Sequence, residues 1–211
     1  MIVAGRLYIA RHGETVFNAG RRIQGDALHT PLTRAGFAQA ESMGLALRRR
    51  LGPQPELTLW SSTAGRALQT LAIIAEHLEL DWHAARVDDR LREIDVGGWS
   101  GRAYADLVAE GGPVLDRDTG LFLRRADDGE WYDGIAARLN DWIADHGQDA
   151  GDRLIIMHGV SSRVFRGLLT GMDARSDHGA PVAPGLPQGS IVMIAQGVEQ
   201  AIHIGDGHAP A

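Results

Sequence analysis

Two short apolar runs in this chain each end in a histidine followed by a glycine, and this repeated pattern constrains the fold most. The first run leads into Arg11 and His12, and the second, at residues 154–157, leads into His158 and Gly159. Such runs are typical of strands that are covered on both faces in a parallel sheet. Because ligands bind beyond the carboxyl ends of such strands, we expect both imidazoles at one sheet edge. An imidazole beside an arginine there is a candidate phosphate site.

The rest of the chain alternates between helix and strand patterns. Helices are expected at residues 33–51, 62–78, 102–109 and 130–146 and after residue 159, with further strands at residues 57–60, 153–157, 190–195 and 198–204. Ser62 is expected to cap the second helix, which would place Arg66 in its first turns. Residues 111–128 and 172–189 are expected to be loops, which often select the substrate. Residues 205–211 are expected to form a frayed tail.

The length, net charge, cysteine content and hydropathy of the chain limit the classes of protein to which it can belong. At 211 residues the chain is long enough for one sizeable core, so we expect a single domain over residues 1–211. A net charge of -6 argues against a general nucleic-acid surface, and the lack of cysteine excludes disulfides and thiolate chemistry. No stretch approaches the roughly 20 apolar residues of a membrane helix. Residues 1–10 lack the pattern of a secretory signal, so we expect a cytoplasmic protein that binds no membrane.

Five motifs follow one another from Arg11 to Arg163. They are Arg11-His12-Gly13-Glu14-Thr15 with Asn18, Gln24-Gly25 before Pro31-Leu32-Thr33, Ser61-Ser62 leading to Arg66-Ala67 and Gln69-Thr70, Leu91-Arg92-Glu93-Ile94 running into Gly97-Gly98-Trp99-Ser100-Gly101, and His158-Gly159 before Arg163. Together they resemble the histidine phosphatase superfamily, the phosphoglycerate mutase-like proteins. The resemblance covers most of the chain, and five ordered motifs are far more specific than one. It implies a three-layer α/β/α sandwich with a mainly parallel central sheet.

The same resemblance implies the site. The catalytic set is Arg11, His12, Arg66, Glu93 and His158, and the substrate-binding residues are Asn18, Gln24, Gly25 and Gly159. Because a phosphomonoester is a dianion, its transfer depends mainly on positioning and charge neutralisation. Arg11, Arg66 and His158 are expected to supply the positive charge.

The expected reaction passes through a covalent phosphohistidine. A neutral His12 imidazole attacks phosphorus, while a nearby carbonyl such as that of Gly13 holds its other ring nitrogen. Glu93 is expected to protonate the leaving oxygen and then to take a proton from the attacking water. The scheme needs no metal and no cofactor, only a small phosphorylated substrate.

Two alternatives stay open at this point. A phosphoglycerate mutase would transfer the phosphoryl group to another hydroxyl, but the resemblance implies a longer insertion between Glu93 and His158 in mutases. A non-catalytic binding module would keep the pocket without the chemistry, and the intact catalytic set argues against it. Thr63, Trp131 and Gln188 depart from the family pattern and leave the choice of substrate undecided. The sequence also leaves a homodimer open.

Overall fold

The computed structural model describes residues 3–207 and is built around one six-stranded sheet. The strands are β1 (Leu7–Arg11), β2 (Leu57–Ser61), β3 (Arg86–Val87), β4 (Asp152–Met157), β5 (Ile191–Ala195) and β6 (Val198–His203). Their order across the sheet is β3-β2-β4-β1-β5-β6. The pairings among β1, β2, β3 and β4 are parallel, and β5 is antiparallel to both of its neighbours. The sheet is therefore mainly parallel, as expected.

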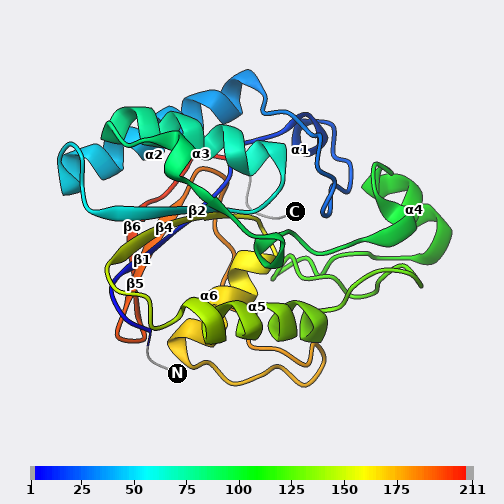
Figure 1. The fold of residues 1–211 in the computed structure, drawn as a ribbon. Helices are drawn as coiled ribbons and strands as arrows, with labels where there is room; N and C mark the ends of the chain where they lie inside the picture. Colours follow the sequence, from blue (N-terminus) through cyan, green and yellow to red (C-terminus); the bar gives the residue numbers. More distant parts are fainter. Residues whose placement is uncertain (1–2, 208–211) are drawn as a thin grey trace.

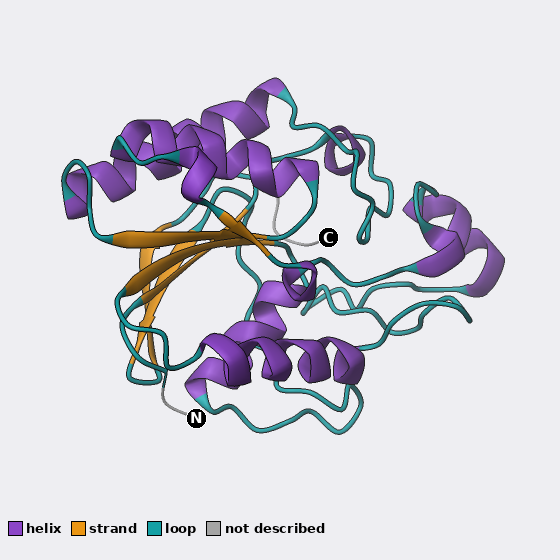
Figure 2. Ribbon diagram, viewed as in Figure 1, coloured by secondary structure: helices purple, strands orange, loops and turns teal. Residues whose placement is uncertain are grey.

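Helices cover both faces of this sheet (Figure 1, Figure 2). The helices are α1 (Val16–Ala19), α2 (Arg34–Leu51), α3 (Gly65–Leu78), α4 (Tyr104–Gly111), α5 (Tyr132–His146) and α6 (Ser161–Thr170), with short 3₁₀ turns η1 (Trp82–Ala84), η2 (Asp89–Leu91) and η3 (Gly97–Trp99). α2 and α3 lie on one face, and α5 and α6 lie on the other. This arrangement confirms the three-layer α/β/α sandwich. α4 lies apart from these layers, at the right of Figure 1.

Alternate residues of the central strands enter two different hydrophobic cores. Leu7 and Ile9 of β1, with Ile155 of β4, pack in the cluster that contains α5 and α6. Tyr8 and Ala10 of β1 pack in the cluster that contains α2 and α3. Because side chains alternate with a period of two, a strand buried on both faces must be apolar throughout. This explains why β1 and β4 read as continuous apolar runs.

The parallel strands also bring their carboxyl ends to one edge. The His12 backbone N–H donates to the Met157 carbonyl at 3.1 Å, just beyond β1 and β4. The Ser62 backbone N–H donates to the Ile156 carbonyl at 3.2 Å, just beyond β2. Residues that follow three strands therefore lie side by side, which is where the site was expected.

Besides α1 and β3, which were not expected, two details differ from the sequence expectations. The N-cap of α3 is Ala64, whose backbone is extended, so the helix begins at Gly65, and the Ser62 hydroxyl accepts from the Ala64 backbone N–H at 3.2 Å. In the expected tail, the Gly205 N–H donates to the Ser190 hydroxyl at 2.9 Å, so this part packs on the body. Residues 208–211 of that tail lie outside the described residues. Within residues 3–207, no helix has both the length and the apolar character to cross a bilayer.

Candidate active site

A cavity of about 430 Å³ opens beyond the carboxyl ends of the central strands. Most of the predicted site residues line it: Arg11, His12, Asn18, Gln24, Gly25, Glu93 and Gly159. Arg66 and His158 are fully buried and are not part of its lining. The structure thus brings the predicted residues together but divides them into a cavity wall and a layer beneath it.

His12 presents one ring nitrogen to this cavity. Its Nδ1 lies 2.7 Å from the Gly13 carbonyl oxygen, which can only accept, so Nδ1 carries the proton and donates. The predicted role of the Gly13 carbonyl is confirmed. Burial, together with Arg66 and Arg11, lowers the pKa of His12 well below its usual range. The ring is therefore neutral at physiological pH, with the lone pair of Nε2 available as a nucleophile.

His158 lies directly behind His12, with the two ring centroids 5.1 Å apart. The Arg66 Nε–H donates to His158 Nδ1 at 3.2 Å, so the proton of this ring sits on Nε2 and is donated to the Ser62 hydroxyl at 2.6 Å. Burial, then Arg66 and His12, lower the pKa of His158 well below its usual range. The expected positive charge is therefore absent from this ring, because a second cation beside buried Arg66 is unfavourable.

Arg66 lies beneath the cavity, where its guanidinium forms hydrogen bonds with carbonyl and hydroxyl groups. Its guanidinium donates to the Gly25 carbonyl at 2.8 Å, the Ala27 carbonyl at 2.5 Å and the Thr30 hydroxyl at 3.1 Å. Burial lowers the pKa of Arg66 to about 10, so the group remains charged at neutral pH. It adds a positive potential beneath His12, and direct contact of Arg66 or His158 with phosphate stays a prediction.

Gly25 allows the backbone conformation that the hydrogen bond from Arg66 to its carbonyl requires. Its φ is +54°, and a Cβ atom there would lie 2.4 Å from Val96 Cγ2. Only glycine fits both conditions, so the backbone can turn here and aim its carbonyl at Arg66.

Arg11 and Glu93 flank Gly159 in the cavity wall. A Cβ atom at Gly159 would lie 3.4 Å from both Arg11 Nη2 and Glu93 Oε2. Arg11 is buried and donates to the Leu186 carbonyl at 2.5 Å. Burial lowers the pKa of Arg11 to about 10, partly offset by Glu93, so it remains cationic. The small residue at position 159 leaves this cation open to a ligand.

Glu93 is held at the start of α6. Its carboxylate accepts hydrogen bonds from the backbone N–H groups of Val160 at 2.9 Å, Ser161 at 2.8 Å and Ile94 at 3.0 Å. A helix N-terminus favours an anion through its unpaired N–H groups and its dipole. The carboxylate is thus fixed at the cavity wall, where it can exchange a proton with a substrate or a water.

Asn18 and Gln24 both turn their amide oxygens toward Thr15. Asn18 Oδ1 accepts from the Thr15 N–H at 3.0 Å, and Gln24 Oε1 accepts from the Thr15 hydroxyl at 2.5 Å. Within residues 3–207, neither amide nitrogen has a hydrogen-bond partner. Because phosphate oxygens are acceptors, this orientation suits both residues to bind them.

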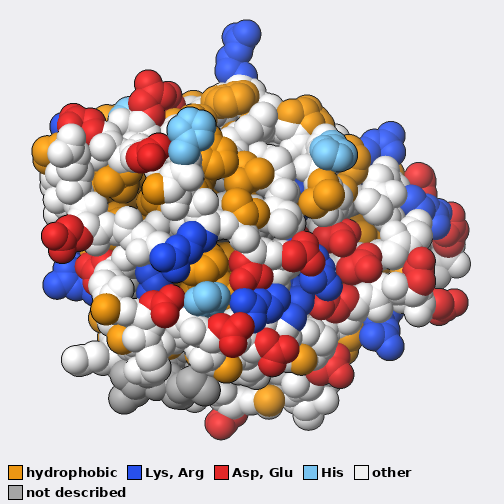
Figure 3. Space-filling model, in the orientation of Figure 1, with side chains coloured by type: hydrophobic (Ala, Val, Ile, Leu, Met, Phe, Trp, Pro, Cys, Tyr) orange, Lys and Arg blue, Asp and Glu red, His pale blue; other side chains and the backbone are white. Residues whose placement is uncertain are grey.

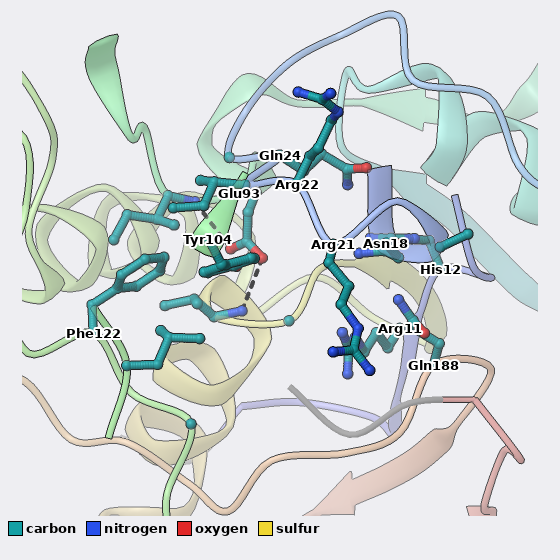
Figure 4. A pocket seen from close by; sticks show the side chains of 18 residues that line it. Arg11, His12, Asn18, Arg21, Arg22, Gln24, Glu93, Tyr104, Phe122 and Gln188 are labelled. Carbon is teal, nitrogen blue, oxygen red and sulfur yellow. Dashed lines mark hydrogen bonds between the residues drawn. The ribbon is translucent and has the colours of Figure 1, made fainter. Parts of the chain in front are cut away.

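The sequence analysis missed several residues of the cavity wall. They are Ala19, Arg21, Arg22, Ile23, Ile94, Tyr104, Leu115, Gly120, Phe122, Val160 and Gln188. In Figure 4, Arg21 extends toward Arg11, whereas Phe122 lies across the cavity. Burial and the Glu93 carboxylate raise the pKa of Tyr104 to about 12, so its phenol keeps its proton. Arg21 could have been found from its place in the polar loop after Asn18, but no motif marks Leu115 or Phe122.

The local charge of the site contrasts with the rest of the surface. Acidic and basic side chains are intermixed on the face shown in Figure 3, where no broad basic area is present. The positive charge that an anion meets in the cavity comes instead from Arg11, Arg21 and Arg22 in its lining, with Arg66 below. Among residues 3–207, no group of three or more potential metal ligands gathers.

The sequence matches the family model of the histidine phosphatase superfamily (branch 1) over residues 7–194. It is 33% identical over 164 residues to the glucosyl-3-phosphoglycerate phosphatase of Mycobacterium tuberculosis, covering 73% of this chain and 69% of that protein. It is 34% identical over 173 residues to "Probable phosphoglycerate mutase GpmB" of Citrobacter koseri, covering 80% and 76% of the two chains.

Solved structures share the fold over nearly the whole chain. The mycobacterial glucosyl-3-phosphoglycerate phosphatase in complex with VO3 aligns with a TM-score of 0.71 and 28% identity, covering 91% of each chain. The alpha-ribazole phosphatase of Shigella flexneri aligns with a TM-score of 0.69 and 23% identity, covering 96% of each chain. The second likeness bears on the fold alone.

Proposed function

The chain belongs to the histidine phosphatase superfamily (branch 1), and from this premise we propose that it hydrolyses phosphate monoesters of small metabolites through phosphorylated His12. The observation that carries the proposal is the His12 ring itself. Its Nδ1 proton is bound to the Gly13 carbonyl and its pKa is well below the usual range. A neutral Nε2 therefore faces a cavity that also contains the cationic Arg11.

The first half of the proposed reaction transfers the phosphoryl group to the protein. His12 Nε2 attacks phosphorus, the bond from phosphorus to the ester oxygen breaks, and a phosphorus–nitrogen bond forms. Protonated Glu93 gives its proton to the leaving oxygen, so the product departs as a neutral alcohol. Arg11 and the amide nitrogens of Asn18 and Gln24 hold the phosphoryl oxygens.

The second half returns the enzyme to its starting state. Water attacks phosphorus, Glu93 takes a proton from that water, and the phosphorus–nitrogen bond breaks to release inorganic phosphate. The backbone N–H groups that bind Glu93 hold its carboxyl group in place at the cavity wall for this step. In this scheme no metal takes part.

A phosphoglycerate mutase is the second candidate, because a relative that is 34% identical carries that name. In that case the phosphoryl group passes from His12 to a second hydroxyl instead of to water. Both candidates share the first half of the reaction, so only the acceptor distinguishes them.

One experiment separates the candidates. Phosphate release is measured on p-nitrophenyl phosphate, sugar phosphates, 3-phosphoglycerate and glucosyl-3-phosphoglycerate, with and without EDTA, beside an assay for interconversion of phosphoglycerates. Steady release that EDTA does not affect is the expected result. Interconversion with little release would favour the mutase, and activity that EDTA abolishes would contradict the metal-free mechanism.

The remaining parts of the proposal concern cell location and assembly. We place the enzyme in the cytoplasm, acting on small phosphorylated substrates and not on nucleic acid, and we leave a homodimer as a prediction. Cell fractionation tests the location, and light scattering of the purified chain tests the assembly.

A further inference from the structure

One wall of the active-site cavity is apolar and comes from outside the three layers of the fold. It is formed by Tyr104 at the start of α4 and by Leu115 and Phe122 in the loop that follows. In Figure 4, Phe122 lies across the cavity from Arg21 and Asn18, and Tyr104 lies between, beside Glu93. The reacting groups therefore face an apolar surface that the phosphoryl transfer itself does not use.

This wall is anchored to the body by specific contacts. The Phe122 backbone N–H donates to the Tyr132 hydroxyl at 3.0 Å, and Leu115 pairs with Phe122 in an isolated antiparallel bridge. Buried Arg163 donates to the Thr119 carbonyl at 2.8 Å between them. Phe122 is only 6% exposed. A wall held in this way can select ligands by shape.

The cavity is large enough to hold more of a substrate than its phosphoryl group. At about 430 Å³ it falls within the range of roughly 300–1,000 Å³ that is typical of sites for drug-sized molecules. A phosphoryl group bound at His12 and Arg11 fills only part of it. The rest is available to the alcohol portion of the ester.

We propose that Tyr104, Leu115 and Phe122 form a subsite for the alcohol portion, and that the preferred substrates are phosphate monoesters of alcohols with an aromatic or branched apolar face. The inference rests on the proposed function for its orientation, since the phosphoryl group must lie at His12. The Tyr104 hydroxyl is the single polar side-chain group of this wall. Sugar or glycerol hydroxyls placed there would lose hydrogen bonds to water with little replacement, whereas an apolar face would gain from burial.

The test compares naphthyl phosphate with glycerol phosphate, both by binding to a His12→Asn variant and by turnover of the wild type. Binding is measured by calorimetry, so it reads the subsite even without hydrolysis. We expect naphthyl phosphate to bind at least about tenfold more tightly. Phe122→Ala, made in the His12→Asn background, should remove most of this preference. The neighbouring Leu123→Ala is the matched control, because Leu123 is 54% exposed and does not line the cavity.

A second variant tests the same wall in case Phe122→Ala does not fold. Leu115 is half-buried, and Leu115→Asn keeps the number and branching of the side-chain heavy atoms while making the wall polar. It should reduce the preference in the same direction, with circular dichroism unchanged. Equal binding of the two esters, or equal losses for both in the Phe122 and Leu115 variants, would overturn the subsite. Selective binding of naphthyl phosphate without any wild-type turnover would instead contradict the proposed function while supporting the subsite.

Discussion

His12 and His158 differ in what their ring nitrogens bind, and this difference assigns their roles. His12 donates Nδ1–H to the Gly13 carbonyl and keeps Nε2 toward the cavity. His158 uses both nitrogens within the protein, accepting from Arg66 and donating to Ser62. This difference supports His12 as the proposed nucleophile, with His158 held as a neutral group behind it.

The lowered pKa of His12 predicts an unusual acid limb for activity. A nucleophile with the ordinary pKa of about 6.5 would lose about tenfold of its neutral form as the pH falls from about one unit above that value to about one unit below it. Since burial and two arginines lower the pKa of His12, its neutral form persists. We expect kcat/KM to fall less than about threefold over that interval. The profile is measured after correction for the ionisation of the substrate, and a full tenfold fall would contradict the assignment.

Arg21 is the cation of the cavity wall that has no partner of its own. Within residues 3–207 its guanidinium forms no hydrogen bond or ion pair, whereas Arg22 donates to the Gly101 carbonyl. Arg21→Gln should raise KM for phosphate esters roughly three- to tenfold, more at low salt, with a smaller change in kcat. Arg34→Gln removes the same charge from an exposed position of α2 and serves as control. Equal changes of KM in the two variants would mean that Arg21 acts only through the net charge of the protein and does not bind the substrate.

At the residue scale, the sequence identified most groups but not the layer in which each lies. Arg11, His12 and Glu93 stand in motifs, and all three reach the cavity. Arg66 and His158 stand in equally strong motifs, yet they lie beneath it. No local sequence pattern predicts whether such a residue lines the cavity or lies beneath it. Its position depends on contacts with residues far away in the sequence, here of Arg66 with the Gly25 carbonyl and of His158 with the Ser62 hydroxyl.

At the scale of elements, the segment that carries Glu93 is held by α5. Arg138 of α5 pairs with Glu130 at 2.9 Å and donates to the carbonyls of Glu93 at 3.3 Å and Arg90 at 2.5 Å. Glu130 in turn accepts from the Asp95 N–H at 3.3 Å. This pair therefore holds the backbone on both sides of Glu93, the proposed general acid, and we propose that it positions this residue.

Arg138→Lys keeps the charge but loses the planar fork that reaches several acceptors at once. We expect kcat for an alkyl phosphate to fall about tenfold with little change in KM. A p-nitrophenyl ester should suffer less, because its leaving group needs little help from Glu93. The control is Arg48→Lys, whose partner Glu79 lies on the surface. Equal losses on both esters would indicate general destabilisation instead.

The elements themselves were largely predictable, although α1 and β3 were not expected, and the two misses that concern the site share one cause. β1, β2, β4, β5 and β6 and the helices α2, α3 and α5 follow their apolar patterns. Ser62 was expected to cap α3, but its hydroxyl is bound to His158, a contact across 96 residues that local capping rules do not contain. The wall formed by Leu115 and Phe122 depends in the same way on Tyr132.

At the scale of the whole molecule, two buried neutral histidines couple folding to pH. The folded pKa values of His12 and His158 lie well below 6.5, so below that pH the unfolded chain binds protons that the folded chain does not. Stability is therefore lost as pH falls through the unfolded value, by up to about 1.4 kcal/mol per unit for each histidine. We expect a shallower loss in His12→Asn than in the wild type, by denaturant unfolding. His29→Asn, at an exposed position, should leave the slope unchanged.

The architecture as a whole follows from strands that are apolar on both faces, and their parallel pairing assembles the site. The pattern of apolar runs indicated such strands, but the family resemblance supplied the order and layers of the fold. Parallel pairing of β1, β4 and β2 then placed His12, His158 and Ser62 at one edge.

The measurement that tests the central claim most directly is the detection of a phosphoryl group on His12 during turnover. The wild type and a Glu93→Gln variant, in which water attack should be slow, are mixed with p-nitrophenyl phosphate and quenched in alkali. The peptide that contains His12 is then analysed by mass spectrometry. We expect phosphorylation on His12, in greater yield in the variant, and none in His12→Asn. Turnover without phosphorylated His12, or full activity in His12→Asn, would contradict the account.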